Sequence, residues 1–269
     1  MLVRILSAVL LLPLLILILL YLPPVYTAIL VAVLSAIAAF ELLWGTGFLK
    51  RIRPVLYSSL FAVLVVAWSY FGLHPKWLTA GIFLFTILLL AELMADHEKL
   101  LFSHICVCFV AGLIIPWMFS SLVRLRSSDY GKVFVAVPFV VSFVADSGAY
   151  FAGVFLGKHK LAPKISPKKT IEGLFGGVLA SALGMVVFSL IVNKLFGFFV
   201  NYLTAVVFGV AGSLVCVFGD LAFSAIKRQT GIKDYGRLIP GHGGVLDRFD
   251  STIFVASMVE LFMDFGLLW

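Results

Sequence analysis

Charged residues are scarce in this chain of 269 residues: Asp, Glu, Lys and Arg make up 12% of it, whereas hydrophobic residues make up 62%. A soluble globular domain is usually about half apolar and about a quarter charged. The composition therefore excludes an ordinary soluble domain and predicts an all-α polytopic integral membrane protein. The formal net charge of +7 does not identify an anionic partner, because lysine and arginine also accumulate on the cytosolic side of membrane proteins.

Cysteine is equally rare, with three residues at positions 106, 108 and 216. Their number is odd, all three lie in apolar runs, and their spacing does not match a zinc site. A disulfide framework or a zinc centre is therefore not expected. The three are expected to be small buried hydrophobic side chains.

Long apolar runs dominate the chain, and a helix needs about 20 apolar residues to cross a bilayer. The first run follows Arg4 as in a signal peptide, but no small-residue cleavage site precedes Pro23-Pro24 and a second run follows at once. The sequence therefore predicts about nine transmembrane helices, at residues 5–22, 25–44, 55–73, 77–94, 100–123, 133–156, 171–192, 195–219 and 251–269.

The loops predict an orientation. With a cytosolic N-terminus, fifteen of the twenty lysines and arginines lie on the cytosolic side, as membrane topology favours. We divide the chain into N-terminal transmembrane helices that act as a scaffold (1–99), middle helices expected to form a dimer contact (100–156) and a C-terminal catalytic region with cytosolic loops (157–269). The protein is expected in the inner (cytoplasmic) membrane, with its active site facing the cytosol.

Small residues line one side of two predicted spans. In the seventh, Gly173 and Gly177 are followed by Ser181 and Gly184, and the eighth contains the pattern Gly209-x-x-x-Ser213. Such faces let helices approach closely. They indicate packing between these spans or across an oligomer interface.

Asp146 lies about ten residues inside the sixth span, hence roughly 15 Å deep at 1.5 Å per residue. An ionisable side chain at that depth is costly unless it faces a partner or a water-filled cavity. A lysine from a neighbouring helix is one alternative partner. The polar neighbours Ser147 and Tyr150 favour an open, hydrated face.

The loop 157–170 carries five lysines, and Pro163 and Pro167 exclude a regular helix through it. A lysine-rich loop often reflects only topology or contact with lipid headgroups. Its last residues, from Ser166 through Lys168 and Lys169 to Thr170, lead into a predicted helix at Ile171. A hydroxyl, backbone N–H groups and two ammonium groups there favour phosphate binding.

The strongest signal is the polar segment 220–251, which carries four carboxylates and five strong bases. If three of the spans pack together, Asp220, Asp247 and Asp250 join Asp146 in one cytosolic cavity. Close carboxylates repel one another unless cations lie between them, and hard oxygen ligands suit Mg²⁺. The alternative is a solvated loop with paired surface charges. The glycines around His242 indicate close backbone approach instead.

His242 is a candidate general base. A phosphate nucleophile is already ionised near pH 7, however, so no proton needs to be removed. A hydrogen bond to phosphate or a structural role is the preferred interpretation.

The polar segment contains a longer pattern: Ser224-Ala-Ile-Lys227-Arg228-x4-Lys233-Asp234-x-Gly236-x2-Ile239-Pro240-x-His242-Gly243-Gly244-Val245-x-Asp247-Arg248-Phe249-Asp250. Further pieces lie upstream: Asp146-Ser-Gly-Ala-Tyr150, Leu161-Ala-Pro-Lys164-Ile-Ser166-Pro-Lys168-Lys169-Thr170-x-Glu172-Gly173 and Gly219-Asp220-Leu221. Together they resemble the signature of the CDP-diacylglycerol synthases, also called phosphatidate cytidylyltransferases. The resemblance covers about residues 140–252, and the first 130 residues are similar only in being hydrophobic.

The resemblance implies a Mg²⁺-dependent homodimeric enzyme that condenses CTP with phosphatidic acid to give CDP-diacylglycerol and pyrophosphate. It implies catalytic roles for Asp220, Asp247, Asp250 and Lys227. Asp146 and the three other aspartates would bind Mg²⁺ and a second cation whose identity the sequence leaves open. The substrate-binding residues would be Ser166, Lys168, Lys169, Thr170, Arg228, Lys233, His242, Gly243, Gly244 and Arg248. Phe223 departs from the pattern, because many members have a glutamate there.

Two other functions remain as hypotheses. A cation-coupled transporter would use Asp146 as its carrier residue, but transporters usually contain two related halves, and no internal repeat is visible here. An alcohol phosphotransferase acting on a CDP-lipid would need a D-G-x2-A-R motif, which is absent. The expected partners are CTP, phosphatidic acid, the bilayer and a second copy of the chain, and no nucleic acid.

Overall fold

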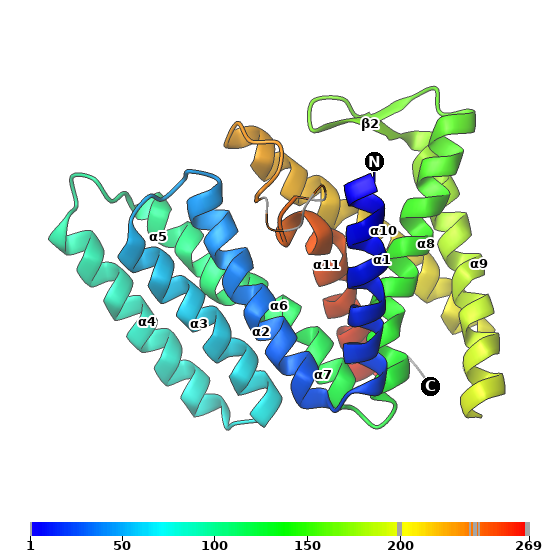
Figure 1. Cartoon of the computed structure of the whole chain (residues 1–269), viewed down its shortest axis with the longest axis horizontal. Helices are drawn as coiled ribbons and strands as arrows, with labels where there is room; N and C mark the ends of the chain where they lie inside the picture. The colour runs from blue at the N-terminus through cyan, green and yellow to red at the C-terminus, as the bar shows by residue number, and fades with distance from the viewer. Residues whose placement is uncertain (1, 198–200, 237, 239–240, 242, 267–269) are drawn as a thin grey trace. The chain divides into compact units, whose positions relative to one another are not determined.

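The computed structural model describes residues 2–197, 201–236, 238, 241 and 243–266. Within these residues the chain is helical apart from one small antiparallel sheet and the connecting loops (Figure 1). It divides into two compact units. The first contains residues 1–128 and 229–249, and the second contains residues 129–228 and 250–269.

The first unit is built from the N-terminal helices. They are α1 (Leu2–Ile16), η1 (Leu17–Tyr21), α2 (Pro24–Phe40), η2 (Glu41–Gly45), α3 (Ile52–Phe71), α4 (Pro75–Ala95), α5 (Phe102–Phe109), η3 (Val110–Ile114), α6 (Ile115–Phe119) and α7 (Ser121–Ser127), where η marks a π-helical segment. Helix α3 packs against α2 and α4. The segment 229–249, which includes the start of α11, belongs to this unit although it lies far along the sequence.

The second unit contains the remaining elements. They are α8 (Gly131–Leu156), β1 (Lys160–Ala162), β2 (Ser166–Thr170), α9 (Ile171–Phe196), α10 (Tyr202–Gln229) and most of α11 (Leu246–Asp264). Strands β1 and β2 form an antiparallel hairpin in which Lys160 pairs with Thr170 and Ala162 with Ser166. The loop 157–170 therefore contains no helix, as its prolines predicted.

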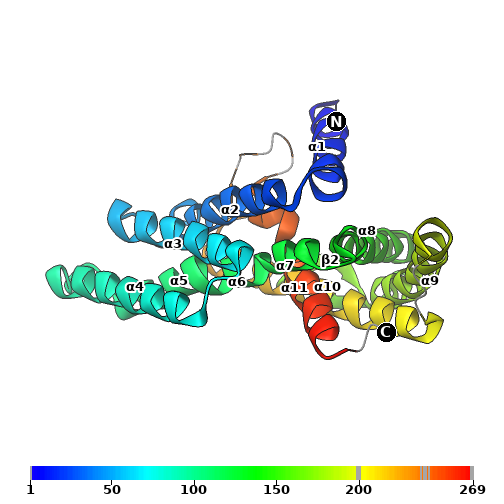
Figure 2. The same ribbon diagram turned by 90° about the horizontal axis from the view of Figure 1, so that it is seen from below.

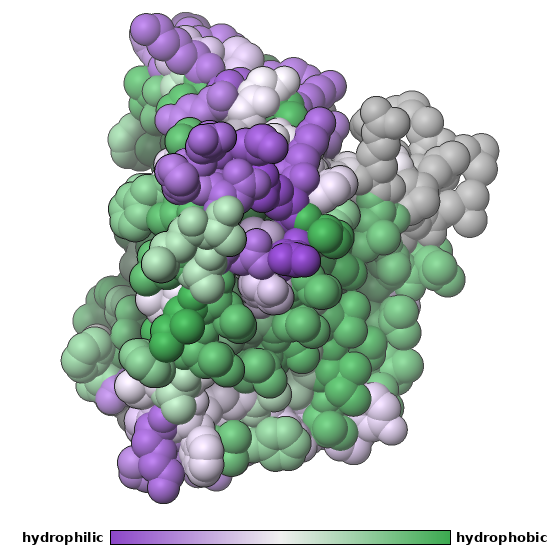
Figure 3. Space-filling view, turned by 90° about the vertical axis from the view of Figure 1, so that its left-hand side faces the viewer, coloured by the Kyte–Doolittle hydropathy of each residue, from purple (hydrophilic) through white to green (hydrophobic). Residues whose placement is uncertain are grey.

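Seven of the predicted spans correspond to helices that are long and apolar enough to cross a bilayer. They are Pro24–Gly45, Ile52–Phe71, Pro75–Ala95, Phe102–Ser127, Gly131–Leu156, Ile171–Leu195 and Tyr202–Gln229. The first predicted span appears as a shorter apolar helix, Val9–Tyr21, and α11 is not among the seven. The side of the molecule on which α4 lies carries a broad hydrophobic surface (Figure 3). The structure supports a multi-pass membrane protein, whereas the count of nine and the side of the N-terminus stay predictions.

Local sequence explains where several helices begin and end. Pro75 starts α4, and the His74 side chain caps it by accepting a hydrogen bond from the Lys76 N–H at 3.2 Å. Helix α3 ends at Gly72 and α9 at Gly197, both with the positive φ that glycine adopts most easily. The prediction that the cysteines are buried is confirmed for Cys108 and Cys216 and is wrong for Cys106, which is exposed.

The small-residue faces allow the helices of the second unit to approach closely. Helices α8 and α9 lie side by side (Figures 1 and 2). A methyl group built on Gly177 would lie 2.9 Å from the Ala145 carbonyl oxygen of α8, and one on Gly209 of α10 would lie 2.6 Å from the Ser181 carbonyl oxygen of α9. The prediction of packing between spans is confirmed, but α9 uses its glycines mainly against α8.

We expect Gly176→Val to lower the free energy of unfolding by about 1–3 kcal/mol, the usual cost of overpacking. The reason is that even a methyl group at Gly176 would overlap with the Ala152 side chain of α8. Thermal unfolding in detergent measures the effect. Leu183→Val is the control, because Leu183 is 60% exposed on the same helix. Equal unfolding midpoints for the two variants would contradict this account of the interface.

Candidate active site

Lys169 and Asp220 form an ion pair in the second unit, with 2.6 Å between Lys169 Nζ and Asp220 Oδ2. Lys169 lies in strand β2 and Asp220 in helix α10. The Ser224 hydroxyl, one turn further along α10, donates a hydrogen bond to Asp220 Oδ1 at 3.1 Å. Two residues that the sequence places in the site are therefore in direct contact, and in this structure the lysine neutralises a carboxylate.

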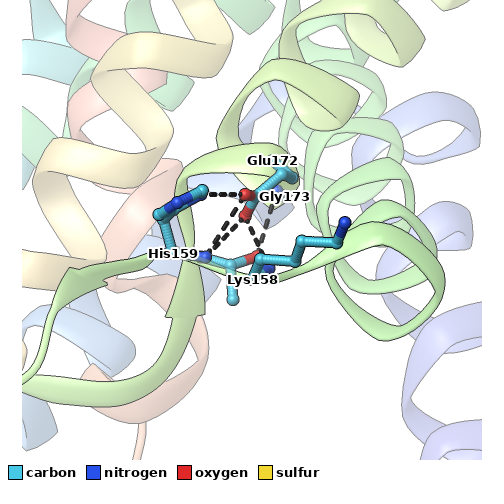
Figure 4. Close-up of polar contacts among 5 residues, drawn as sticks. Lys158, His159, Glu172 and Gly173 are labelled. Carbon is cyan, nitrogen blue, oxygen red and sulfur yellow. Dashed lines mark hydrogen bonds and ion pairs between the residues drawn. The ribbon is translucent and has the colours of Figure 1, made fainter.

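Glu172 fixes the base of the hairpin that carries Lys169 (Figure 4). Its carboxylate accepts hydrogen bonds from the backbone N–H groups of Lys158 and His159, at 3.0 and 3.2 Å, and lies 2.6 Å from His159 Nδ1. On the neighbouring residue, the Thr170 hydroxyl accepts a hydrogen bond from the Gly173 N–H at 3.1 Å and caps α9. The hairpin is thus held at the start of α9, and this helix begins at Ile171 as predicted.

Asp146, Asp220 and Asp250 come from three helices of the second unit and act on one another electrostatically. Asp250 lies at the start of α11, is 9% exposed, and accepts a hydrogen bond from the Ser251 N–H at 2.8 Å. Burial, followed by the negative charge of Asp220, raises the pKa of Asp250 to about 7, and Asp146 acts in the same direction. The charges of these three predicted acids therefore influence one another.

Close backbone packing places Asp250 beside α10. A methyl group built on Gly219 would lie 2.8 Å from the Asp250 carbonyl oxygen. Cys216, one turn before Asp220 on α10, donates a hydrogen bond from Sγ to Asp146 Oδ1 at 3.8 Å. Helix α10 therefore contacts both of the other acid-bearing helices.

Basic side chains adjoin these acids. Lys227 is buried, at 9% exposure, and its charge acts on Asp250. Arg228 is exposed, and its Nε donates to the Ile165 carbonyl in the hairpin turn at 3.2 Å. Lys168 is exposed and Ser166 is half-buried. The positive charge of these side chains, at the hairpin and the end of α10, is suited to binding an anion.

Asp247 lies in the first unit, where it organises the segment before α11. Its Oδ2 atom accepts hydrogen bonds from the backbone N–H groups of Tyr235, at 2.8 Å, and Gly244, at 2.9 Å. Gly244 was predicted to bind substrate, but its N–H group is bound within the chain. Lys233 and Arg248 are exposed and Gly243 is half-buried. His242 lies outside the described residues.

Glu41 is a buried acid of the first unit that the sequence did not single out. It is 4% exposed, and its two carboxylate oxygens accept hydrogen bonds from the Val245 and Leu246 N–H groups, each at 3.0 Å. Its position at the end of a predicted span gave no sign of these contacts. The only available signal was the rarity of acids within the apolar N-terminal half.

Comparison with known proteins identifies the family of this chain. The model of the cytidylyltransferase family matches residues 2–265. The chain belongs to the cytidylyltransferase family. It is 32% identical to a phosphatidate cytidylyltransferase of Staphylococcus epidermidis over 86% of this chain and 88% of the relative. The corresponding protein of Bacillus subtilis is 34% identical over 84% of each chain, and that of Helicobacter pylori is 36% identical over 84% of this chain and 82% of the relative.

Phe223 shows how this cytidylyltransferase-family protein accommodates its departure from the sequence pattern. The ring is 4% exposed and packs edge-on against Phe254 of α11, with 6.1 Å between ring centroids. An apolar contact between α10 and α11 thus occupies the position where a glutamate is common.

The acids of this cytidylyltransferase-family protein do not form a preformed metal site within the part of the chain that the structure describes. Among the described residues, no group of three or more His, Cys, Asp or Glu side chains is arranged so that it holds a metal ion as it stands. The chemistry of the donors nevertheless suits Mg²⁺, which usually binds one or two carboxylates together with water and substrate phosphates. Asp220 and Asp250 match that requirement, because both are carboxylates and their negative charges repel each other.

Proposed function

We propose that this protein is a membrane-bound phosphatidate cytidylyltransferase, which condenses CTP with phosphatidic acid to form CDP-diacylglycerol and pyrophosphate. The observation that carries this proposal is the Lys169–Asp220 pair beside Asp250 in the second unit. Its pairing of acidic and basic groups suits phosphate chemistry, and it occurs in a chain whose relatives are named for this activity.

In the proposed reaction, an oxygen of the phosphatidic acid phosphate attacks the α-phosphorus of CTP. A new P–O bond forms, the bond to the bridging oxygen of pyrophosphate breaks, and pyrophosphate leaves with that electron pair. The attacking phosphate is already ionised near neutral pH, so the chain need not supply a general base. Its residues then contribute positioning and charge neutralisation.

The bases supply that positive charge in our proposal. Lys169 would exchange its ion pair with Asp220 for a phosphate oxygen, and Lys227 would neutralise charge from the end of α10. The other assigned contacts rest on the sequence pattern: Ser166, Lys168, Thr170, Arg228, Lys233, His242, Gly243 and Arg248. Gly244 would contribute close backbone approach only, because its N–H group is bound to Asp247.

Mg²⁺ is the proposed cofactor. Asp220 and Asp250 would hold it with Asp146, and Asp247, one turn before Asp250 on α11, joins the set on the strength of the sequence pattern. When bound, the ion would supply positive charge to the triphosphate oxygens. A second cation of unassigned identity remains part of the proposal.

The proposed location of the active site relative to the membrane follows from the proposed substrates. A diacyl lipid stays in its leaflet, whereas CTP arrives from the cytosol, so the site belongs at the cytosolic surface of the inner membrane. We further propose that the protein works as a homodimer.

The test is direct. Purified protein incubated with phosphatidic acid, labelled CTP and Mg²⁺ is expected to yield labelled CDP-diacylglycerol and pyrophosphate, and to lose this activity with EDTA. CMP release from CDP-diacylglycerol with serine or glycerol phosphate would favour the phosphotransferase hypothesis instead. Cation flux into proteoliposomes that disappears in Asp146→Asn would favour the transporter hypothesis.

A further inference from the structure

An acid of the N-terminal helices holds the segment that leads into α11. Glu41 opens η2, directly after α2, and both of its carboxylate oxygens are hydrogen-bonded to backbone N–H groups at the start of α11. The partners, Val245 and Leu246, are more than 200 residues away in sequence and belong to the same compact unit. Hydrogen bonds to an ionised carboxylate are stronger than those between neutral groups.

Glu41 and Asp247 together bind four N–H groups of this segment. Asp247 takes those of Tyr235 and Gly244, and Glu41 takes those of Val245 and Leu246. The first N–H groups of a helix have no partner within the helix, and negative charge there is favourable. The chain's own acids thus occupy three consecutive N–H groups, at residues 244–246. Phosphate recognition by this segment therefore falls to its basic side chains rather than to these N–H groups.

Glycines allow close packing around Glu41. Methyl groups built on Gly236 and on Gly244 would both overlap with the Glu41 carboxylate, and one on Gly45 would overlap with the Tyr235 carbonyl oxygen. Tyr235, Gly236 and Gly244 therefore lie directly against η2. Asp247 binds the N–H groups of Tyr235 and Gly244, and Glu41 binds those of Val245 and Leu246.

We infer that Glu41 is a positioning residue for the reaction: it holds the start of α11, and with it Asp247, in the geometry that catalysis requires. The inference rests on the proposed function, because that function makes Asp247 catalytic. Displacement of a reacting group by about 1 Å lowers a rate by roughly 10²-fold. Loss of Glu41 is therefore expected to act on turnover more than on substrate affinity.

The experiment compares Glu41→Gln and Glu41→Ala with Glu92→Gln. Glutamine keeps the shape and one acceptor, so kcat is expected to fall about 10-fold, whereas alanine removes both acceptors and kcat should fall about 10²-fold. KM for CTP should stay within about threefold of wild type in both, since the Glu41 carboxylate is bound to backbone N–H groups and is not assigned to a substrate. Hydrogen exchange of the amides in residues 243–248 should be faster in Glu41→Gln than in wild type, and fastest in Glu41→Ala.

Glu92→Gln is the matched control. Glu92 also lies in the first unit, on α4, but it accepts its hydrogen bond from the Tyr57 hydroxyl at 3.3 Å instead of from the segment before α11. It is expected to leave kcat and the exchange of residues 243–248 unchanged. A Glu41→Ala variant with kcat within twofold of wild type and unaltered exchange would overturn the inference.

Gly236→Ala tests the contact between Gly236 and the Glu41 carboxylate from the other side. It provides a second measurement if Glu41→Ala does not fold. The added methyl group would push against the carboxylate, so kcat should fall. In the double variant Glu41→Gln with Gly236→Ala, the losses should be less than additive, because both act on one contact. Additive losses would contradict the inference. If wild-type protein makes no CDP-diacylglycerol, the proposed function fails, yet the exchange measurements still decide whether Glu41 holds the segment.

Discussion

Asp250→Asn is expected to lower kcat by about 10²- to 10³-fold, the usual cost of removing one group that stabilises charge in a transition state. Asparagine retains the Oδ1 acceptor, so the hydrogen bond from the Ser251 N–H can persist. It lacks the negative charge that we assign to Mg²⁺ binding. Labelled CTP incorporation into lipid, followed over a range of Mg²⁺ concentrations, measures the loss.

The stability of the same variant separates a catalytic role from a structural one. Asp250 is buried, and a buried carboxylate carries a solvation cost that a neutral amide largely avoids. The unfolding midpoint of Asp250→Asn in detergent should therefore equal or exceed that of wild type. Asp264→Asn is the control, because Asp264 is exposed at the far end of α11. It should change neither kcat nor the unfolding midpoint. An active Asp250→Asn enzyme, within about threefold of wild-type kcat, would remove Asp250 from the site.

Features that depend on neighbouring residues could be predicted from the sequence. Apolar length located the seven helices that are long and apolar enough to cross a membrane, because backbone hydrogen bonding within a helix is a local requirement. Two prolines excluded a helix from 157–170, and the helix expected at Ile171 begins there with Thr170 as its cap. The gathering of Asp146, Asp220, Asp247 and Asp250 in one cavity stays a prediction, although the charges of Asp146 and Asp220 act on Asp250.

Contacts between distant segments could not be predicted in the same way. Glu41 and Val245 are 204 residues apart, and nothing near Glu41 distinguishes it from an acid at the end of any span. The glycines of α9 predicted a close helix contact but not its partner, since a small face fits any helix with a complementary one. α8 supplies that face through residues such as Ala145 and Ala149.

Lys169→Gln is expected to lower kcat/KM by about 10²-fold, because it removes the positive charge that we assign to a substrate phosphate. In this structure the ammonium group is paired with Asp220 at 2.6 Å. Glutamine leaves that carboxylate without its cation and cannot neutralise a phosphate oxygen. Lys169→Arg keeps the charge and should recover part of the activity, although its planar group has a different shape.

Lys164→Gln is the matched control for Lys169→Gln, since Lys164 lies exposed in the turn between β1 and β2 and is not assigned to the site. A general attraction of the basic hairpin for anionic lipid would make the two variants equally defective, and added salt would weaken wild type and both variants alike. A specific phosphate contact predicts a loss confined to Lys169→Gln, and it predicts that Lys169→Arg is the better enzyme. Equal losses in the two glutamine variants would therefore reassign the hairpin from substrate binding to membrane attachment.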